Sequence, residues 1–200
     1  MSPERIIDVA RELIETSGVD SLSMRKLAAE LGVAPTAIYW HVGGRDELLH
    51  AVLDQMIQEA PPIRPRGDTP RARAASVARA IRRNVRNNPV PFQLAQALDR
   101  NPDTAFAGQM ALAREVAAAG LTGDDAANAV RAVLYLVGGF QLVEGNVTNR
   151  PAGARTTQDM WQNVSDDEID PSVRDALASD LDIDALFEFA LDAMLASLLP

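Results

Sequence analysis

The chain of 200 residues contains no cysteine, one lysine and two histidines, and aromatic residues make up 4% of it. The absence of cysteine excludes disulfides, thiol catalysis and cysteine-ligated metal sites, and it suits a reducing cytoplasm without requiring one. The sequence also lacks a glycine-rich phosphate loop and an HExxH pattern, which makes an enzyme of those classes unexpected. No apolar run of about 18 residues is free of charge, and the N-terminus is amphipathic, so we expect neither a membrane span nor a signal peptide.

Alanine, leucine and valine dominate what remains, and 47% of the residues are hydrophobic. Few segments alternate with the period of two that a half-buried strand requires, which predicts an all-α fold. The length suits one medium domain and a small one.

The net charge of −9 argues at first against DNA binding, but the charges are distributed unevenly. Residues 64–86 hold eight arginines against a single aspartate, whereas residues 87–200 hold six arginines against 17 acidic residues. The arginine-rich helix could contact phosphates or could pack away from DNA. The acidic remainder would keep the protein soluble and discourage unspecific phosphate binding.

Residues 22–42 read as two short helices around a tight turn, and they are the most informative part of the chain. Ser23 is a good N-cap for the first helix. Gly32 can take a positive φ and turn the chain, and Pro35 suits the first position of the second helix, which runs to about His41. Such a pair can place its second helix in the major groove of DNA.

The second helix carries Tyr39, Trp40 and His41 on its outward side. Exposed aromatic side chains favour a binding surface, because tyrosine and histidine can bond phosphates and apolar ring faces can contact thymine methyl groups. One of the two aromatics could instead pack the helix against its neighbours. A metal or acid–base site of His41 with Asp46 or Glu47 would lack a third partner, so we expect no metal, no cofactor and no catalytic residue.

The chain resembles the tetracycline-repressor (TetR) family of bacterial regulators. The similarity is carried by LSMRKLA at 22–28, LGV at 31–33, IYWHV at 38–42 and RDELL at 45–49, and it covers residues 1–60. It implies an all-α fold with a three-helix DNA-binding domain over residues 1–60, whose helix-turn-helix motif lies at about 23–42. A fourth helix would join this domain to a C-terminal effector-binding and dimerisation domain over 61–200.

The resemblance also implies which residues touch DNA. Arg25 would reach a base edge or phosphate, although it could instead form a surface ion pair with Glu30 or Asp46. Arg45 would touch the phosphate backbone, whereas Gly43 and Gly44 replace residues that are often more basic. The predicted DNA-binding residues are Ser23, Arg25, Lys26, Pro35, Thr36, Ala37, Tyr39, Trp40, His41 and Arg45.

Caps, prolines and apolar periodicity predict the remaining elements. We expect helices over about 3–17, 24–31, 35–41, 45–60, 70–87, 91–100, 102–119, 124–146, 170–178 and 182–199. The proline-rich stretch PPIRPRGDTP at 61–70 marks the domain boundary, and 147–163 reads as largely loop.

The helix at 124–146 and the last helix are apolar on more than one face, so each must be buried on several sides. The residues alone leave open whether this burial is within one chain or against a second copy, and the family resemblance favours a homodimer. The predicted interface residues are Val137, Gly138, Leu186, Phe187, Leu191, Met194 and Leu195.

An effector pocket in the C-terminal part would combine apolar bulk with a few polar groups. The candidate lining residues, each of which could equally be ordinary core, are Phe92, Gln93, Gln96, Phe106, Gln109, Met110, Tyr135, Phe140, Gln141, Glu144 and Trp161. Both histidines lie in the N-terminal part, so a tetracycline–magnesium ligand is not expected, and an apolar or aromatic effector is favoured.

The sequence therefore predicts a cytoplasmic, homodimeric regulator that binds a palindromic DNA operator and is released by a small-molecule effector. We expect the effector to act on the fourth helix through residues 60–70. One alternative is a DNA-binding regulator that responds to a protein partner or to no ligand. A second alternative is a helical small-molecule carrier or enzyme whose N-terminal unit is vestigial.

Overall fold

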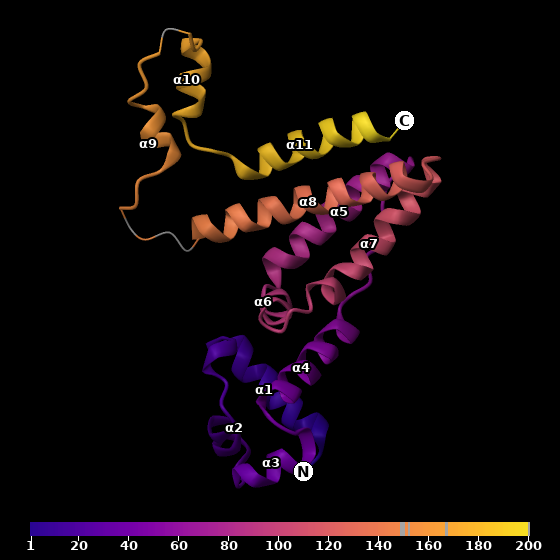
Figure 1. The fold of residues 1–200 in the computed structure, drawn as a ribbon, viewed down its shortest axis with the longest axis vertical. Coiled ribbons are helices and arrows are strands. Elements are labelled where there is room, and N and C mark those ends of the chain that lie inside the picture. The colour runs from indigo at the N-terminus through magenta and orange to yellow at the C-terminus, as the bar shows by residue number, and fades with distance from the viewer. Residues whose placement is uncertain (149–150, 152, 167, 200) are drawn as a thin grey trace.

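The computed structural model describes residues 1–148, 151, 153–166 and 168–199 (Figure 1). The described residues are helical or irregular, with no strand among them, which confirms the predicted all-α class. The elements are α1 (Pro3–Ser17), the short 3-10 turn η1 (Val19–Ser21), α2 (Met24–Leu31), α3 (Pro35–Val42), α4 (Arg45–Glu59), α5 (Pro70–Asn87), α6 (Val90–Ala97), α7 (Asn101–Ala118), α8 (Gly123–Thr148), α9 (Thr157–Trp161), α10 (Pro171–Leu177) and α11 (Ile183–Leu198).

Helix starts follow local chemistry. The hydroxyls of Ser2, Ser23 and Thr69 accept hydrogen bonds from the backbone N–H groups of Arg5, Lys26 and Ala72, and so begin α1, α2 and α5. Proline occupies the first position of α1, α3, α5 and α10, where its missing N–H costs nothing.

Two hydrophobic cores organise the molecule. The first joins α1, α2, α3 and α4, and it includes Leu94 and Ala95 of α6, which are fully buried. The irregular segment between α4 and α5 contains the domain boundary predicted at residue 60. However, α6 from beyond that boundary packs into the first core.

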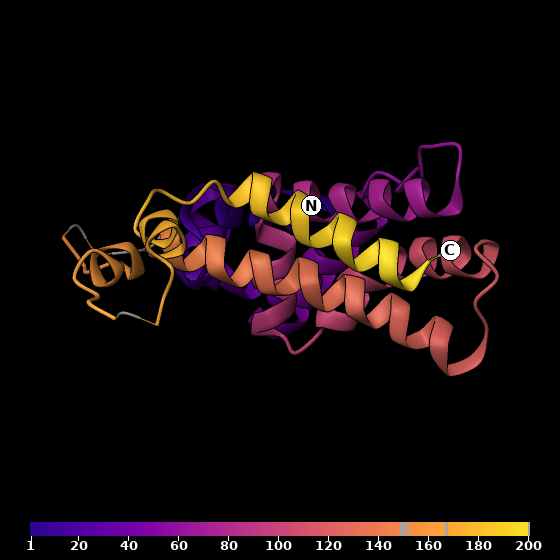
Figure 2. The same ribbon diagram turned by 90° about the horizontal axis from the view of Figure 1, so that it is seen from above.

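The second core joins α5, α7, α8 and α11 (Figure 1). Its helices approach closely at Gly108, where an added Cβ would lie 2.7 Å from Cδ1 of Ile81. Seen from above, α8 and α11 lie side by side along one face of the molecule (Figure 2).

The residues between α8 and α11 carry α9 and α10, which lie at one end of the molecule, outside the two cores (Figures 1 and 2). None of the described residues of these two helices is buried. The short helix α9 falls in the stretch predicted to be largely loop.

One segment of α8 is long and strongly apolar. Gly123–Gly145 is long and apolar enough, by length and composition alone, to cross a membrane, although it contains Asp124, Asp125, Arg131 and Glu144. Only 22% of its most apolar window is buried within the chain. Core helices of soluble proteins can have the same length and composition, so these two properties do not place α8 in a membrane.

Candidate nucleic-acid interface

The helices α2 and α3 form a compact unit at one end of the molecule (Figure 1). Gly32 ends α2 in the left-handed conformation with φ of 67°. The N–H of Val33 then donates to the carbonyl of Ala28 at 3.0 Å, which completes the turn. Ile38 is fully buried against the first core and fixes the rotation of α3 about its axis.

The rotation set by Ile38 turns the aromatic side of α3 to solvent. Trp40 is 91% exposed and Tyr39 is 51% exposed. Trp40 therefore does not staple α3 to the rest of the chain, and the packing alternative is wrong for this residue. An indole held outward on a rigid helix is available to a partner.

The other predicted contacts lie on the same unit. Ser23, Arg25, Pro35, Thr36 and His41 are exposed, and Lys26 and Ala37 are half-buried. Within the described chain, Arg25 forms no ion pair with Glu30 or Asp46, so the surface-pair alternative is not observed. Contact of these residues with DNA stays a prediction.

Arg45, at the first position of α4, points back toward the start of α2. Its Nε donates to the carbonyl of Leu22 at 3.0 Å, and its Nη2 donates to the carbonyl of Val19 at 3.1 Å. Its Nη1 lies 4.0 Å from the carboxylate of Asp46. The guanidinium therefore already has protein partners.

The α3–α4 turn is closed by a carboxylate. Glu47 accepts a hydrogen bond from the backbone N–H of Gly44 at 3.0 Å and so caps the start of α4. Within the described residues, no group of three or more His, Asp or Glu side chains could hold a metal ion.

The arginine-rich helix α5 belongs to the second core. Arg79, Arg82 and Arg86 of α5 face Asp184, Glu188 and Asp192 of α11, and we call this set the α5–α11 ladder. Arg73 bonds Glu115 of α7 at 2.6 Å. Each of these four arginines therefore has an acidic partner within the chain, which favours the alternative in which they pack away from DNA.

Distances in the α5–α11 ladder show an antiparallel register. Arg79 lies 2.5 Å from Glu188 and 3.5 Å from Asp192, whereas Arg86 lies 2.7 Å from Asp184. Hydrogen bonding to Glu188 raises the pKa of Arg79 above its ordinary value. Desolvation opposes ionisation of Asp184, but hydrogen bonds from Arg86 and Arg82 outweigh it and lower its pKa.

Arg82 is the buried member of the α5–α11 ladder, with 6% of its surface exposed. Its guanidinium carbon lies 4.4 Å from the ring centroid of Phe187 and 5.7 Å from that of Phe140. It also hydrogen-bonds Glu144 of α8, and the Gln141 amide donates to its backbone carbonyl at 3.0 Å. Two predicted pocket residues are thus engaged with Arg82, Glu144 with its guanidinium and Gln141 with its backbone carbonyl.

A second arginine links the two cores. Arg100, just before α7, bonds Asp54 of α4 at 2.7 Å and Asp103 at 2.6 Å, and its Nη1 lies 3.3 Å from Nδ1 of His50. Hydrogen bonds to Asp54 and then Asp103 raise its pKa. This link is not predictable from the sequence, because Arg100 lies about 50 residues from His50 and Asp54 and the three residues share no motif.

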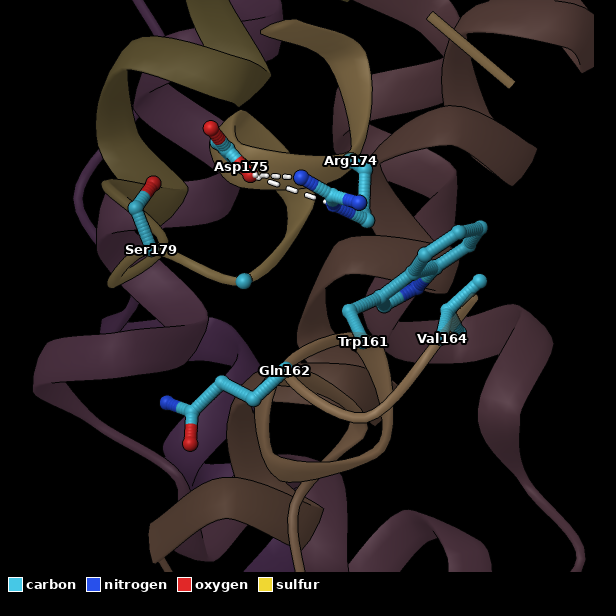
Figure 3. Close-up of a pocket in the computed structure, with 7 residues that line it drawn as sticks. Trp161, Gln162, Val164, Arg174, Asp175 and Ser179 are labelled. Atoms are coloured by element: carbon cyan, nitrogen blue, oxygen red, sulfur yellow. Dashed lines mark hydrogen bonds and ion pairs between the residues drawn. The ribbon is translucent and has the colours of Figure 1, made fainter. Parts of the chain in front are cut away.

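The predicted pocket residues do not converge on one cavity of the described chain. A hollow of about 440 Å³ lies between α4 and the start of α7, and Phe106 is the predicted residue that lines it, beside Asp54, Ile57, Gln58 and Arg100. A hollow of about 540 Å³ lies between α9 and α10, where Trp161 faces Arg174 (Figure 3). Phe92 is half-buried, Tyr135 is 78% exposed and Met110 is 39% exposed. Gln93, Gln96 and Gln109 are also exposed.

The predicted dimer residues divide into two groups. Val137, Phe187, Leu191 and Leu195 are at most 2% exposed, so their own chain already encloses them and leaves little of their surface for a second copy. Gly138 and Leu186 are exposed and Met194 is half-buried. Other exposed apolar residues on α8 and α11, which the prediction missed, are Tyr135, Leu142, Val143 and Phe189.

Residues 6–52 match the family model of bacterial regulatory proteins of the tetR family. The HTH-type transcriptional repressor Rv1353c of Mycobacterium tuberculosis is 35% identical over 153 residues, which are 72% of this chain. The match covers 58% of the length of that relative.

Solved structures extend the similarity over the whole chain. ActR of Streptomyces coelicolor, a TetR family protein solved in complex with actinorhodin, is 26% identical with a TM-score of 0.71, covering 99% of this chain and 96% of its own. SCO7222, a TetR regulator of the same organism, is 27% identical with a TM-score of 0.72, covering 99% and 97%.

Proposed function

We propose that this chain, which belongs to the TetR family of bacterial regulatory proteins, is a homodimeric repressor that binds a palindromic DNA operator and is released by a small-molecule effector. The relatives matched are transcriptional regulators. No enzyme activity is proposed.

The outward Trp40 and Tyr39 on α3 are the observation that carries the proposal. An unused Trp on a short helix exposes apolar surface to water, and major-groove binding would cover it. Arg25 lies at the start of the neighbouring α2, and no acidic side chain among the described residues forms an ion pair with it. Arginine can bond guanine bidentately, which is the commonest base-specific contact.

Selection of the purified protein against random duplex DNA at about 0.15 M salt tests the proposal, because unspecific phosphate binding is weakened there. Enrichment of one palindrome, with half-sites about one helical turn or more apart, is the expected result. No enrichment by folded protein, with or without candidate effectors, would contradict it.

Two variants test the interface once an operator is known. Arg25→Ala is expected to weaken operator binding by roughly 10-fold or more and to relax specificity at the base it reads. Tyr39→Ala should weaken binding without changing the preferred sequence, since phosphate contacts carry no base information. Arg114→Ala, an exposed arginine of α7 in the C-terminal body, is the matched control.

An aromatic effector is the class that ActR supports, since that structural relative was solved with actinorhodin. In this chain Phe106 offers an exposed ring at the hollow between α4 and α7. Movement of α6 or α7 would reach α4 through Arg100 and Asp54 and through Leu94 and Ala95 in the first core. We propose this path beside the expected one through residues 60–70.

A panel of aromatic compounds tests for an effector. For each compound we would measure the melting temperature of the protein and its release from operator DNA. A true effector raises the melting temperature and lowers operator affinity, since only a ligand that binds the two states differently can shift them. Arg100→Ala should lose much of the operator release. Because Arg100 also lines the hollow beside Phe106, the ligand-induced rise in melting temperature is measured on the same variant, and release is compared at saturating ligand. Release unchanged in this variant would exclude the Arg100 path.

A regulator without a small-molecule effector is the second candidate. The burial of Arg82 between Phe140 and Phe187 favours it, because these groups fill space that a ligand would need. Operator binding together with a panel that shifts no melting temperature would support this candidate.

A further inference from the structure

Arg45 stands at the junction of α3 and α4, where the sequence predicts a phosphate contact. In the structure its planar guanidinium reaches across to the chain that leads into α2. Nε and Nη2 donate to the carbonyls of Leu22 and Val19 at 3.0 and 3.1 Å. Val19 is the first residue of the turn η1, and Leu22 directly follows that turn, immediately before Ser23.

The geometry points to a different role: we propose that Arg45 is a positioning residue for the DNA-binding face, rather than a phosphate contact. The inference rests on the proposed function for its DNA readout. Arg45 ties the beginning of α4 to the backbone from which α2 starts, so the N-terminal turn of α2 keeps a fixed place relative to α3. That turn carries Ser23, Arg25 and Lys26.

The local backbone makes this tie effective. Ser23 caps α2 through the N–H of Lys26 at 3.2 Å, and Leu22 is 2% exposed, so a shift of residue 22 would move both the cap and a core side chain. On the other side, the bond from Gly44 to Glu47 fixes the start of α4. The guanidinium therefore joins two anchored segments.

The side chain is also less suited to phosphate than a free arginine. Two of its three nitrogens are already donating, and the third lies 4.0 Å from the carboxylate of Asp46. Lysine cannot replace it, since one ammonium nitrogen cannot reproduce a fork aimed at two carbonyls. A lysine at position 45 would keep the positive charge but lose the two hydrogen bonds, so this substitution distinguishes a positioning role from a purely electrostatic one.

Arg45→Lys provides the test, with operator affinity measured between about 0.1 and 0.3 M NaCl. Positioning predicts roughly a tenfold loss of affinity with the slope of log affinity against log salt unchanged, because no phosphate contact is removed. A phosphate contact predicts near wild-type affinity and slope for Arg45→Lys, and a slope smaller by about 0.9 for Arg45→Gln. The latter pair of results would overturn the proposal.

Two controls keep the outcomes separate. Lys26→Gln, a predicted phosphate contact, should lower the salt slope by about 0.9. Hydrogen exchange of the free protein should show faster exchange of amides 22–27 in Arg45→Lys, with the rest of the chain unchanged. Unchanged exchange would refute positioning. If the wild type selects no DNA, the proposed function fails, while the exchange measurement still decides the role of Arg45.

Discussion

Gly32 shows how one residue fixes the angle between α2 and α3. Its φ of 67° lies in the left-handed region, and an added Cβ would meet no atom within 4 Å. A substitution would therefore cost backbone strain alone. We expect Gly32→Ala to lower the free energy of unfolding by about 1 kcal/mol, measured by urea denaturation.

Gly145→Ala is the matched control for that prediction. Gly145 also has open space around its Cβ position, but it lies inside α8 with a helical backbone. Alanine should stabilise this site by roughly 0.5–1 kcal/mol. Equal effects of the two substitutions would show that the left-handed conformation of Gly32 carries no penalty.

At the residue scale, local rules were sufficient for the helix-turn-helix unit. The cap at Ser23, the turn at Gly32 and the start at Pro35 lie where the sequence predicts them. Arg45 was predictable only in position. Its acceptors are carbonyls 23 and 26 residues earlier in the chain, and every residue has a carbonyl, so no side-chain pattern marks them.

At the scale of elements, the arginines of α5 also have partners that the sequence does not reveal. Their spacing predicts one basic face of a helix, but the same face could meet DNA phosphates or acidic side chains. Asp184, Glu188 and Asp192 also repeat every four residues, yet about 100 residues separate the two helices. Pairing of this kind depends on how α11 folds back, which composition cannot specify.

The α5–α11 ladder leads to a charge-swap prediction. Arg79→Glu would place a carboxylate against Glu188 and Asp192 and should lower the melting temperature by a few degrees. The effect is small because Arg79 and Glu188 are 38% and 43% exposed, where solvent screens each pair. Adding Glu188→Arg should recover most of the loss, as measured by calorimetry.

The charge-swap prediction needs a control variant at an exposed ion pair elsewhere in the chain. Arg174→Glu, in an exposed pair with Asp175 of α10, should change the melting temperature little. A double variant no more stable than Arg79→Glu alone would mean that the pairing across α5 and α11 does not determine how α11 is held.

At the scale of the whole molecule, α6 lies beyond residue 60 in the chain but packs into the first core, so the domains predicted from sequence are less independent than that boundary suggests. The proline-rich residues 61–70 predict where the first domain ends. They do not predict which core α6 joins, because its apolar face could pack into either. The packing of Leu94 and Ala95 decides this, together with the bond from Arg100 to Asp54. Both contacts connect segments that the sequence separates.

Several large apolar side chains of α8 and α11 are exposed. Leu142 and Phe189 are 69% and 73% exposed, and Tyr135 on α8 is 78% exposed. Apolar surface of this kind favours a protein interface, and a second copy would cover it with the same face. We expect Leu142→Glu combined with Phe189→Glu to yield a folded monomer by analytical ultracentrifugation.

Loss of the dimer should weaken binding to the full palindrome by roughly 100-fold or more, because each half-site would then be bound separately. Binding to a single half-site should change little. Phe106→Glu, which places the same charge at an exposed aromatic of α7, controls for added negative charge and should remain dimeric. A double variant that stays dimeric would place the interface on another face, while a monomeric wild type would contradict the homodimer itself.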